Sequence, residues 1–391
     1  MKLVKMSLAA AILMGASAFA IDNVKVSGDA KLFYTTQDDG DNSLFSKEGA
    51  AGQAALGLGV SADLTSGISA GTHLTALSTL GLQGQLVDAV WVDTNGVDDY
   101  FWFDEAWLAG TAGKTTLKAG RMALDTPLVF TETWNIAKNT FEAAVLINTD
   151  LPGTTLVGAY VGGQNGGTVL APASIAPVNA NGTTNFSQFY NGAYTVGAIN
   201  NSFEPLTVQA WYYDATRVIQ AYWLQADLNL KGIVAGVQYT GQEVQEATVA
   251  DADSQDAFAV KLGYESDMFN ISGAYSATGE KGPINVGANL AASGQSKLYT
   301  EAWWYYGIIS QIDTTAFNVT ATGSVADYNL GLYYTQAEVG ANDLAFSEAT
   351  FELARSVGPV DVGLYYIYTK YDADNNGDAY NTVQAYLTYN F

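Results

Sequence analysis

The sequence predicts an all-β fold, a transmembrane antiparallel β-barrel of about 18 strands, with about 16 as the next most favoured count. The first observation is the composition, which is 48% hydrophobic but only 14% charged, against roughly 25% charged residues in ordinary soluble domains. The second is that no apolar run after residue 20 reaches the ~18–20 residues of a transmembrane helix, which excludes a helical membrane protein. The third is period-two alternation in segments of about ten residues, the length of a tilted membrane strand.

Residues 1–20 are expected to form a secretory signal peptide, which leaves residues 21–391 as a single barrel domain. Lys2 and Lys5 give the positively charged start, and the apolar stretch 6–15 is too short to span a bilayer. Ala18-Phe19-Ala20 fits the small-residue pattern of a cleavage site. We therefore expect the chain to be exported.

Alternation of apolar and polar residues recurs along the remainder of the chain. At 56–64, Leu, Val and Ala occupy the even positions, while Gly, Ser and Asp occupy the odd ones. Such alternation predicts strands with one apolar and one polar face. The candidate strands begin near residues 24, 53, 68, 104, 115, 140, 154, 191, 205, 217, 231, 256, 268, 315, 328, 346, 359 and 380.

The links between these strands alternate in length. Short links such as 65–67, 112–114 and 357–359 are rich in Gly, Pro, Asn and Asp, which suits tight turns. The long links are 37–52, 80–103, 122–139, 163–190, 241–255 and 279–314. Outer-membrane barrels have this asymmetry, with short periplasmic turns and long outer loops. The link at 214–216 breaks the alternation, because it is short where a long loop is expected.

A closed barrel explains how an apolar protein can lack a long apolar run. Inside lipid every backbone N–H and C=O needs an internal partner, so strands must close into a barrel without a free edge. Tyrosines at strand ends fit the aromatic girdles of such barrels: Tyr34, Tyr160, Tyr212, Tyr239 and Tyr275. About eighteen strands would enclose an aqueous channel rather than a packed interior.

Charge and composition exclude several functions. The chain carries 39 acidic and 16 basic residues, for a net charge of −23, so nucleic acid is not an expected partner. The absence of Cys excludes disulfides and thiolate chemistry. His73 is the single histidine, which excludes a multi-histidine metal site, and we expect it to be a wall or surface residue. No catalytic constellation is visible, so we do not expect an enzyme.

The C-terminus carries a separate signal. The chain ends at Phe391, with Tyr389, Leu387, Ala385 and Val383 at alternate positions before it. This pattern resembles the terminal signal by which the outer-membrane barrel-assembly machinery recognises its clients. Tyr389 and Phe391 are the expected assembly-signal residues, and that machinery is an expected partner.

Four motifs carry a family resemblance. They are GRMALDTP at 120–127, ETWN at 132–135, NTFEA at 139–143 and TTLVGAY at 154–160. With them, the chain resembles porins of the Campylobacter major outer membrane protein type, most specifically over 105–162. Met122 stands where members of that family often carry Gln.

The resemblance implies an eighteen-stranded, trimeric diffusion porin of the cell outer membrane, in contact with lipid and lipopolysaccharide. It also implies that loop 3, at about 122–139, folds inward as a constriction. Calcium binds to members of the family, although the resemblance does not identify its ligands residue by residue, and no cofactor is required.

The link 122–139 and the strand before it hold the candidate constriction residues. If the link folds inward, Asp125 and Glu132 face the narrow part of the lumen, with Lys118 and Arg121 on the strand leading to it. Opposed acids and bases would create a transverse field across the pore. Arg121 shares parity with the expected lipid-facing residues, so either the strand ends before it or a bulge turns it inward.

The segment 372–378 matches the first half of a calcium loop. Asp372, Asp374 and Asp378 are the candidate metal ligands, and Gly377 occupies the sixth position. The twelfth position is Val383 rather than the bidentate Glu of an EF-hand. An acidic outer loop without a metal is the alternative interpretation.

The leading functional hypothesis is a water-filled channel for passive diffusion of small hydrophilic solutes and ions. We expect cation preference, because the 39 acids face 14 bases once Lys2 and Lys5 are removed with the signal peptide. One alternative is a substrate-specific outer-membrane channel. Another, from a different class, is a secreted all-β glycan-binding or hydrolase protein, since paired carboxylates are plentiful.

Overall fold

The computed structural model describes residues 22–82, 100–134, 136–166, 186–245, 253–282, 285–291 and 294–391. The expected signal peptide lies outside these described residues. No helix in these ranges has the length and apolarity needed to cross a membrane.

Eighteen antiparallel strands form one continuous sheet. They are β1 (Asp22–Gln37), β2 (Ala50–Thr65), β3 (Ile68–Ser78), β4 (Tyr100–Ala112), β5 (Thr115–Met122), β6 (Phe141–Asn148), β7 (Thr154–Gln164), β8 (Ser187–Phe203), β9 (Leu206–Ala215), β10 (Ile219–Leu230), β11 (Ile233–Val244), β12 (Gln255–Glu265), β13 (Phe269–Thr278), β14 (Thr314–Val325), β15 (Tyr328–Val339), β16 (Leu344–Val357), β17 (Val360–Tyr371) and β18 (Tyr380–Asn390). The eighteen-strand prediction is confirmed, and every predicted strand start lies within four residues of the observed one.

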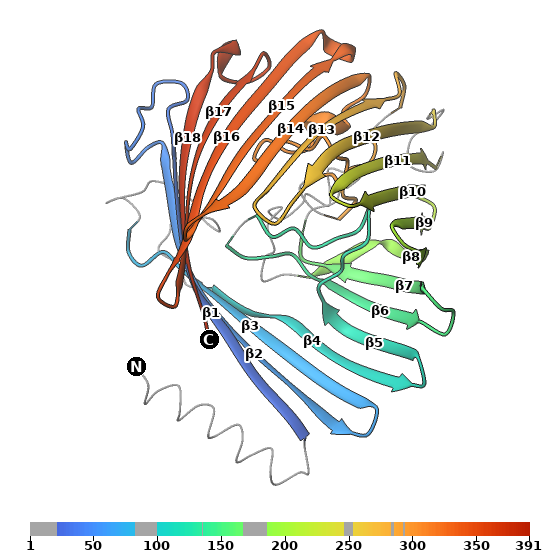
Figure 1. Cartoon of the computed structure of the whole chain (residues 1–391). Helices are drawn as coiled ribbons and strands as arrows, with labels where there is room; N and C mark the ends of the chain where they lie inside the picture. Colours follow the sequence, from blue (N-terminus) through green and yellow to red (C-terminus); the bar gives the residue numbers. More distant parts are fainter. Residues whose placement is uncertain are drawn as a thin grey trace.

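The sheet closes on itself through its first and last strands. Each strand pairs with its neighbours in sequence, and β1 pairs with both β2 and β18. At the seam, Asp29 lies opposite Asn390 and Gln37 lies opposite Thr382. Figure 1 shows the tilted strands curving around a central space, which the teal trace after β5 and the orange trace before β14 both enter. Closure gives each strand two neighbours, as a lipid environment requires.

Link lengths follow the predicted asymmetry. At one end of the barrel most turns are short: two residues join β2 to β3, β4 to β5 and β16 to β17. At the other end lie the long links, although β9 and β10 are joined by residues 216–218 alone. We call these the short-link end and the long-link end, which correspond to the periplasmic and outer sides of a bacterial barrel.

The outward face of the wall is apolar and the inward face holds small and polar groups. Leu56, Leu108 and Leu262 are 53%, 53% and 65% exposed, as expected of side chains that face lipid. Tyr160, Tyr212, Tyr239 and Tyr275 also remain exposed. Inward neighbours such as Gln53, Thr75 and Thr240 are instead buried. The 3₁₀ turns η1 (Ile308–Ser310), η2 (Gly340–Asn342) and η3 (Asn375–Gly377) occur in links at the long-link end.

The terminal Phe391 packs against the first strand. Backbone hydrogen bonds of 2.8 Å run in both directions between Phe391 and Gly28. The ring of Phe391 lies over Gly28, where an added Cβ would approach it to 2.4 Å and the Gly57 carbonyl oxygen to 2.7 Å. Glycine at this position therefore leaves room for the last residue at the seam.

We predict that Gly28→Ala weakens barrel closure by about 1–3 kcal/mol, because the new methyl group overpacks the contact between Phe391 and the first strand. The measurement is the temperature at which the fast-migrating folded band disappears in detergent gels. Gly110→Ala is the matched control, since a Cβ there meets nothing within 4 Å. Equal band stability in both variants would contradict the prediction.

Candidate functional site: the occupied lumen

Two links run through the interior of the barrel instead of extending away from it. The first inward segment, 123–140, joins β5 to β6, and the second inward segment, 285–313, joins β13 to β14. Leu128, Ala291 and Ile309 are each fully buried. The second segment was expected to be an outer loop. Its burial among wall residues shows that the long-link pattern does not distinguish a loop that leaves the barrel from one that enters it.

The two inward segments are joined by hydrogen bonds. The Asn289 amide donates to the Phe130 carbonyl oxygen and to a Glu132 carboxylate oxygen, both at 2.9 Å. The Leu290 backbone N–H donates to the Leu128 carbonyl oxygen at 2.9 Å. Asn289 is fully buried, so these bonds form away from water and fix one segment against the other.

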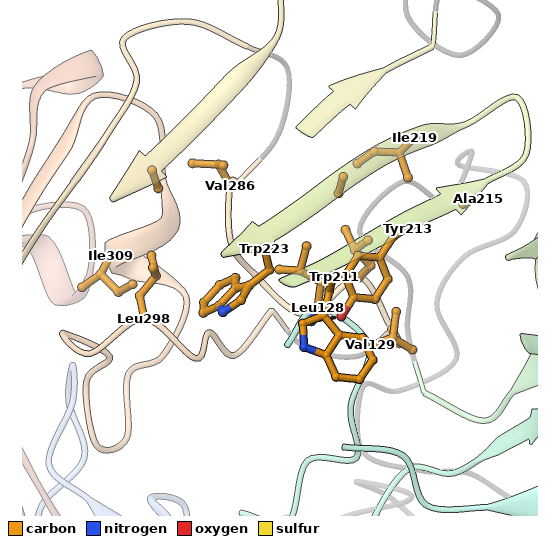
Figure 2. Packing of buried hydrophobic residues seen from close by; sticks show 14 of the residues in the cluster. Leu128, Val129, Trp211, Tyr213, Ala215, Ile219, Trp223, Val286, Leu298 and Ile309 are labelled. Atoms are coloured by element: carbon orange, nitrogen blue, oxygen red, sulfur yellow. Dashed lines mark hydrogen bonds between the residues drawn. The ribbon is translucent and has the colours of Figure 1, made fainter. Parts of the chain in front are cut away.

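An apolar cluster fixes the joined segments to one side of the wall. Leu128, Val129, Val286 and Leu298 pack with wall residues that include Trp211, Tyr213 and Trp223, as Figure 2 shows. The Tyr213 hydroxyl also accepts a hydrogen bond from the Leu128 backbone N–H at 3.3 Å. The interior beside β9 and β10 is therefore packed like a protein core and excludes water.

A charged group fixes the first inward segment to the opposite wall. Lys138 forms an ion pair with Glu105, and its ammonium lies 3.9 Å from Asp104. His73 donates through Nδ1 to Asp104 at 2.6 Å. A register shift between His73 and Leu74 places Asp104 and Glu105 beside one another on the lumen side. His73 is thus a wall residue as predicted, but its ion-pair network was not foreseen.

Lys118 and Arg121 lie on opposite faces of β5. Lys118 faces the lumen, with its ammonium 4.2 Å from the centre of the Trp107 ring. Arg121 keeps the parity of the exposed Leu117 and pairs at 2.9 Å with Glu142 on the outward face. The placement of Arg121 in the constriction is therefore wrong. The strand continues to Met122 in regular register, so no bulge turns Arg121 inward.

Asp125 and Glu132 have different environments on the first inward segment. The Asp125 carboxylate is 89% exposed and forms an ion pair with Lys297 of the second segment. Glu132 is only 4% exposed. Its carboxylate accepts hydrogen bonds from Asn289 and, at 2.9 Å, from the Trp134 indole N–H. Glu132 therefore holds the segments together rather than lining open lumen, which corrects its predicted position.

The three candidate calcium ligands do not converge. Asp372 accepts from the Ala345 backbone N–H, and Asp374 accepts from Asn375 and from the Tyr380 hydroxyl. Within the described ranges no group of three His, Cys, Asp or Glu side chains could hold a metal ion. These residues form the acidic link after β17, and the carboxylates of Asp372 and Asp374 bond to that link and to the neighbouring strands.

The two expected assembly-signal residues, Tyr389 and Phe391, lie near the seam with ring centres 5.8 Å apart.

One cavity inside the described part of the barrel is lined by aromatic rings. A cavity of about 600 Å³, here called the aromatic chamber, lies between the inward segments and the wall formed by β14, β15, β17 and β18. Its aromatic lining residues are Trp134, Tyr299, Trp303, Trp304, Tyr333, Tyr365 and Tyr386. Glu301 is the one carboxylate among the described lining residues, and they include no Lys, Arg or His.

Two further carboxylates lie beside the aromatic chamber, Glu348 buried and Glu352 half-buried. Glu348 accepts hydrogen bonds from the backbone N–H groups of Trp304 and Tyr305 at 2.9 and 2.7 Å. Glu352 accepts from the Tyr333 hydroxyl at 2.7 Å and from the Tyr365 hydroxyl at 3.3 Å. No ion pair between either carboxylate and a basic side chain occurs among the described residues. No basic side chain therefore balances the charge of Glu352 in this part of the lumen.

Glu301 is held by the backbone of its own segment. Backbone N–H groups of Ser296, Ala302 and Gly307 donate to its carboxylate at 2.6, 3.2 and 2.9 Å. Desolvation inside the barrel nevertheless outweighs these bonds and raises the pKa of Glu301 to about 8, with a smaller contribution from Glu348.

Comparison with known proteins defines the family. A sequence model of Gram-negative porins matches residues 7–297, about three quarters of the chain. The chain belongs to the Gram-negative porin family. Its family and fold are those of channel proteins, and they place it in the outer membrane. Among curated proteins, none matches this porin.

Solved structures agree with this porin across nearly its whole length. Pseudomonas aeruginosa OccK8 (OprE) superposes with a TM-score of 0.73 at 13% identity, covering 94% of this chain and 98% of that one. A BenF-like porin from Pseudomonas fluorescens Pf-5 gives a TM-score of 0.76 at 10% identity, with the same coverage. OccK9 (OpdG) of P. aeruginosa gives 0.75 at 12% identity, again with 94% and 98% coverage. At these identities the likeness concerns the fold alone.

We predict that Asn289→Ala loosens the joined segments. The change leaves buried acceptors on Phe130 and Glu132 without this donor, at a cost of about 1–3 kcal/mol. The expected result is a noisier open-channel current and a lower temperature of unfolding. Asn329→Ala is the matched control, since Asn329 is exposed at the short-link end and accepts one bond from Ser324. An open-channel current with unchanged noise in Asn289→Ala would show that the Asn289 hydrogen bonds do not hold the two segments together.

We also predict that cation selectivity increases as the pH rises through about 8. Because the pKa of Glu301 is raised, its carboxyl holds a proton below that pH and becomes negative above it. Reversal potentials measured across the pH range would show the step, and Glu301→Gln should remove it. Asp378→Asn, on the link after β17, should leave it intact. A step of the same size in Glu301→Gln would exclude Glu301 as its source.

Proposed function

We propose that this porin is a passive diffusion channel for small hydrophilic solutes and ions, with preference for cations. The observation that carries the proposal is the surroundings of the aromatic chamber: Glu352 bonds to two of its rings, and no Lys, Arg or His occurs among the described lining residues. Negative charge inside a low-dielectric wall raises the local concentration of cations and repels anions.

Lumen-facing bases elsewhere support the same preference, because acids accompany most of them. Lys138 is paired with Glu105, Lys297 with Asp125 and Lys31 with Asp29. Lys261 lies 4.0 Å from Asp227. Glu352, beside the aromatic chamber, has no such counter-ion among the described residues, so its negative charge remains there, and Glu301 adds to it above about pH 8.

Reversal potentials under a potassium chloride gradient test the proposal. We expect potassium to be more permeant than chloride, and Glu352→Gln to reduce that ratio by removing a negative charge beside the chamber. Asp361→Asn is the control, because that residue is exposed at the short-link end of β17. Anion preference in the unmodified channel would overturn the proposal.

A substrate-specific channel is the second candidate, favoured by the narrowing that the two inward segments impose. Saturable uptake of a solute, together with block of the ionic current by that solute, would distinguish it from a general pore. A secreted glycan-binding protein is disfavoured, because the chain belongs to a family of outer-membrane channels.

Several narrower expectations complete the proposal. We infer export through the signal peptide 1–20, insertion by the barrel-assembly machinery through Tyr389 and Phe391, and assembly as a homotrimer in contact with lipopolysaccharide. The outward Arg121–Glu142 pair supports a covered outer face, since charges that face lipid are costly. The narrower kinship with Campylobacter-type porins rests on the motifs at 120–160.

A further inference from the structure

We propose that the aromatic chamber is a binding site for organic ammonium cations. This inference rests on the proposed cation preference and goes further, because it names a class of solute and a place where that solute pauses. An ammonium or quaternary ammonium group is attracted to the face of an aromatic ring, most strongly where water is excluded.

The rings form a pre-arranged concave surface. Trp303 lies nearly parallel to Tyr365 with ring centres 4.6 Å apart, and Tyr333 lies 6.2 Å from Trp303. On the other side Trp134 meets Trp304 edge to face at 5.7 Å. Rings from both inward segments and from three wall strands thus line the same space.

Two glycines fix the position of the wall tyrosines. The Tyr333 ring lies over Gly331, where an added Cβ would approach the ring to 2.6 Å. The Tyr365 ring lies over Gly363, where the corresponding approach is 2.9 Å. Each tyrosine therefore lies down along its strand and presents its hydroxyl to Glu352.

Glu352 makes the surface more attractive to a cation. Both tyrosine hydroxyls donate to its carboxylate, which increases the electron density of the two phenol rings and places a negative charge at their hydroxyl ends. An incoming cation would be attracted by the ring faces and also by the nearby carboxylate.

The porin shows the same recognition with its own lysines. Lys118 lies over Trp107 at 4.2 Å, Lys261 over Tyr299 at 4.2 Å and Lys297 over Phe130 at 4.6 Å. Among the described residues no basic side chain covers Trp303, Tyr333 or Tyr365 in this way. Trp303 and Tyr365 cover one face of each other, so a cation from solution would contact the ring surface that the three residues leave toward the cavity.

Block of the potassium current tests the inference. Choline is the probe, and 3,3-dimethylbutan-1-ol is its neutral counterpart of the same shape. We expect choline to reduce the current with saturation and the neutral alcohol to have little effect. Equal block by both compounds, or stronger block by benzoate or glucose, would overturn the assignment to ammonium cations.

Variants locate the site. Trp303→Leu should raise the half-blocking concentration of choline about tenfold, whereas Trp107→Leu, which removes a ring outside the chamber, should change it less than about twofold. Glu352→Gln should weaken block while leaving every ring in place. Heat-modifiable migration in detergent gels identifies folded protein, and quenching of tryptophan fluorescence by choline measures binding without current. An unchanged half-blocking concentration in folded Trp303→Leu would overturn the site.

The two proposals fail differently. A channel that conducts potassium with cation preference but shows neither choline block nor choline-dependent fluorescence would overturn the binding site and leave the proposed function intact. A folded protein that conducts no ions, or prefers anions, would overturn the proposed function and with it this inference.

Discussion

The structure depends on one constraint: in lipid, every backbone hydrogen-bonding group of the wall must find its partner within the protein. The pairing of β1 with β18 meets this requirement, because it removes the two edges that an open sheet of eighteen strands would leave. The arrangement of apolar and polar faces follows from closure, since one face of each strand must meet lipid and the other must meet the interior. At the seam, closure also depends on Gly28, because the ring of the C-terminal Phe391 packs against this glycine.

A barrel of this size encloses more space than a selective channel needs, and the two inward segments reduce it. They pack against the wall beside β9 and β10 as a dry apolar cluster, and they leave an aromatic and acidic passage beside β14, β15, β17 and β18. The polar ties that hold them, Asn289 to Glu132 and Lys138 to Glu105, lie inside the protein, where each bond is stronger than it would be in water. Function thus comes from what fills the barrel.

The strands of the wall could be predicted from the sequence, but most of the structure inside the lumen could not. Alternation and link length predict the strands because each wall residue faces either lipid or the interior, and this choice repeats every second position. The same alternation predicted that Lys118 faces the lumen. It also showed that Arg121 has the parity of a lipid-facing residue, which conflicted with its assignment to the constriction. Glu132 and the second inward segment could not be assigned, because the burial of each depends on the other, and Glu132 is 157 residues from its partner Asn289. The consecutive acids Asp104 and Glu105 broke the strand pattern, and that break marks the bulge where Lys138 binds.

The contacts of the first inward segment reach both ends of the chain. Its Trp134 carbonyl oxygen accepts a hydrogen bond from Tyr386 of β18, and its Ile136 packs with Phe33 of β1. These two strands become neighbours when the seam forms, so the complete seat for this segment does not exist in an open sheet. The passage therefore cannot reach its final width until β1 and β18 have paired. Closing the seam and setting the width of the passage are linked, because β1 and β18 take part in both.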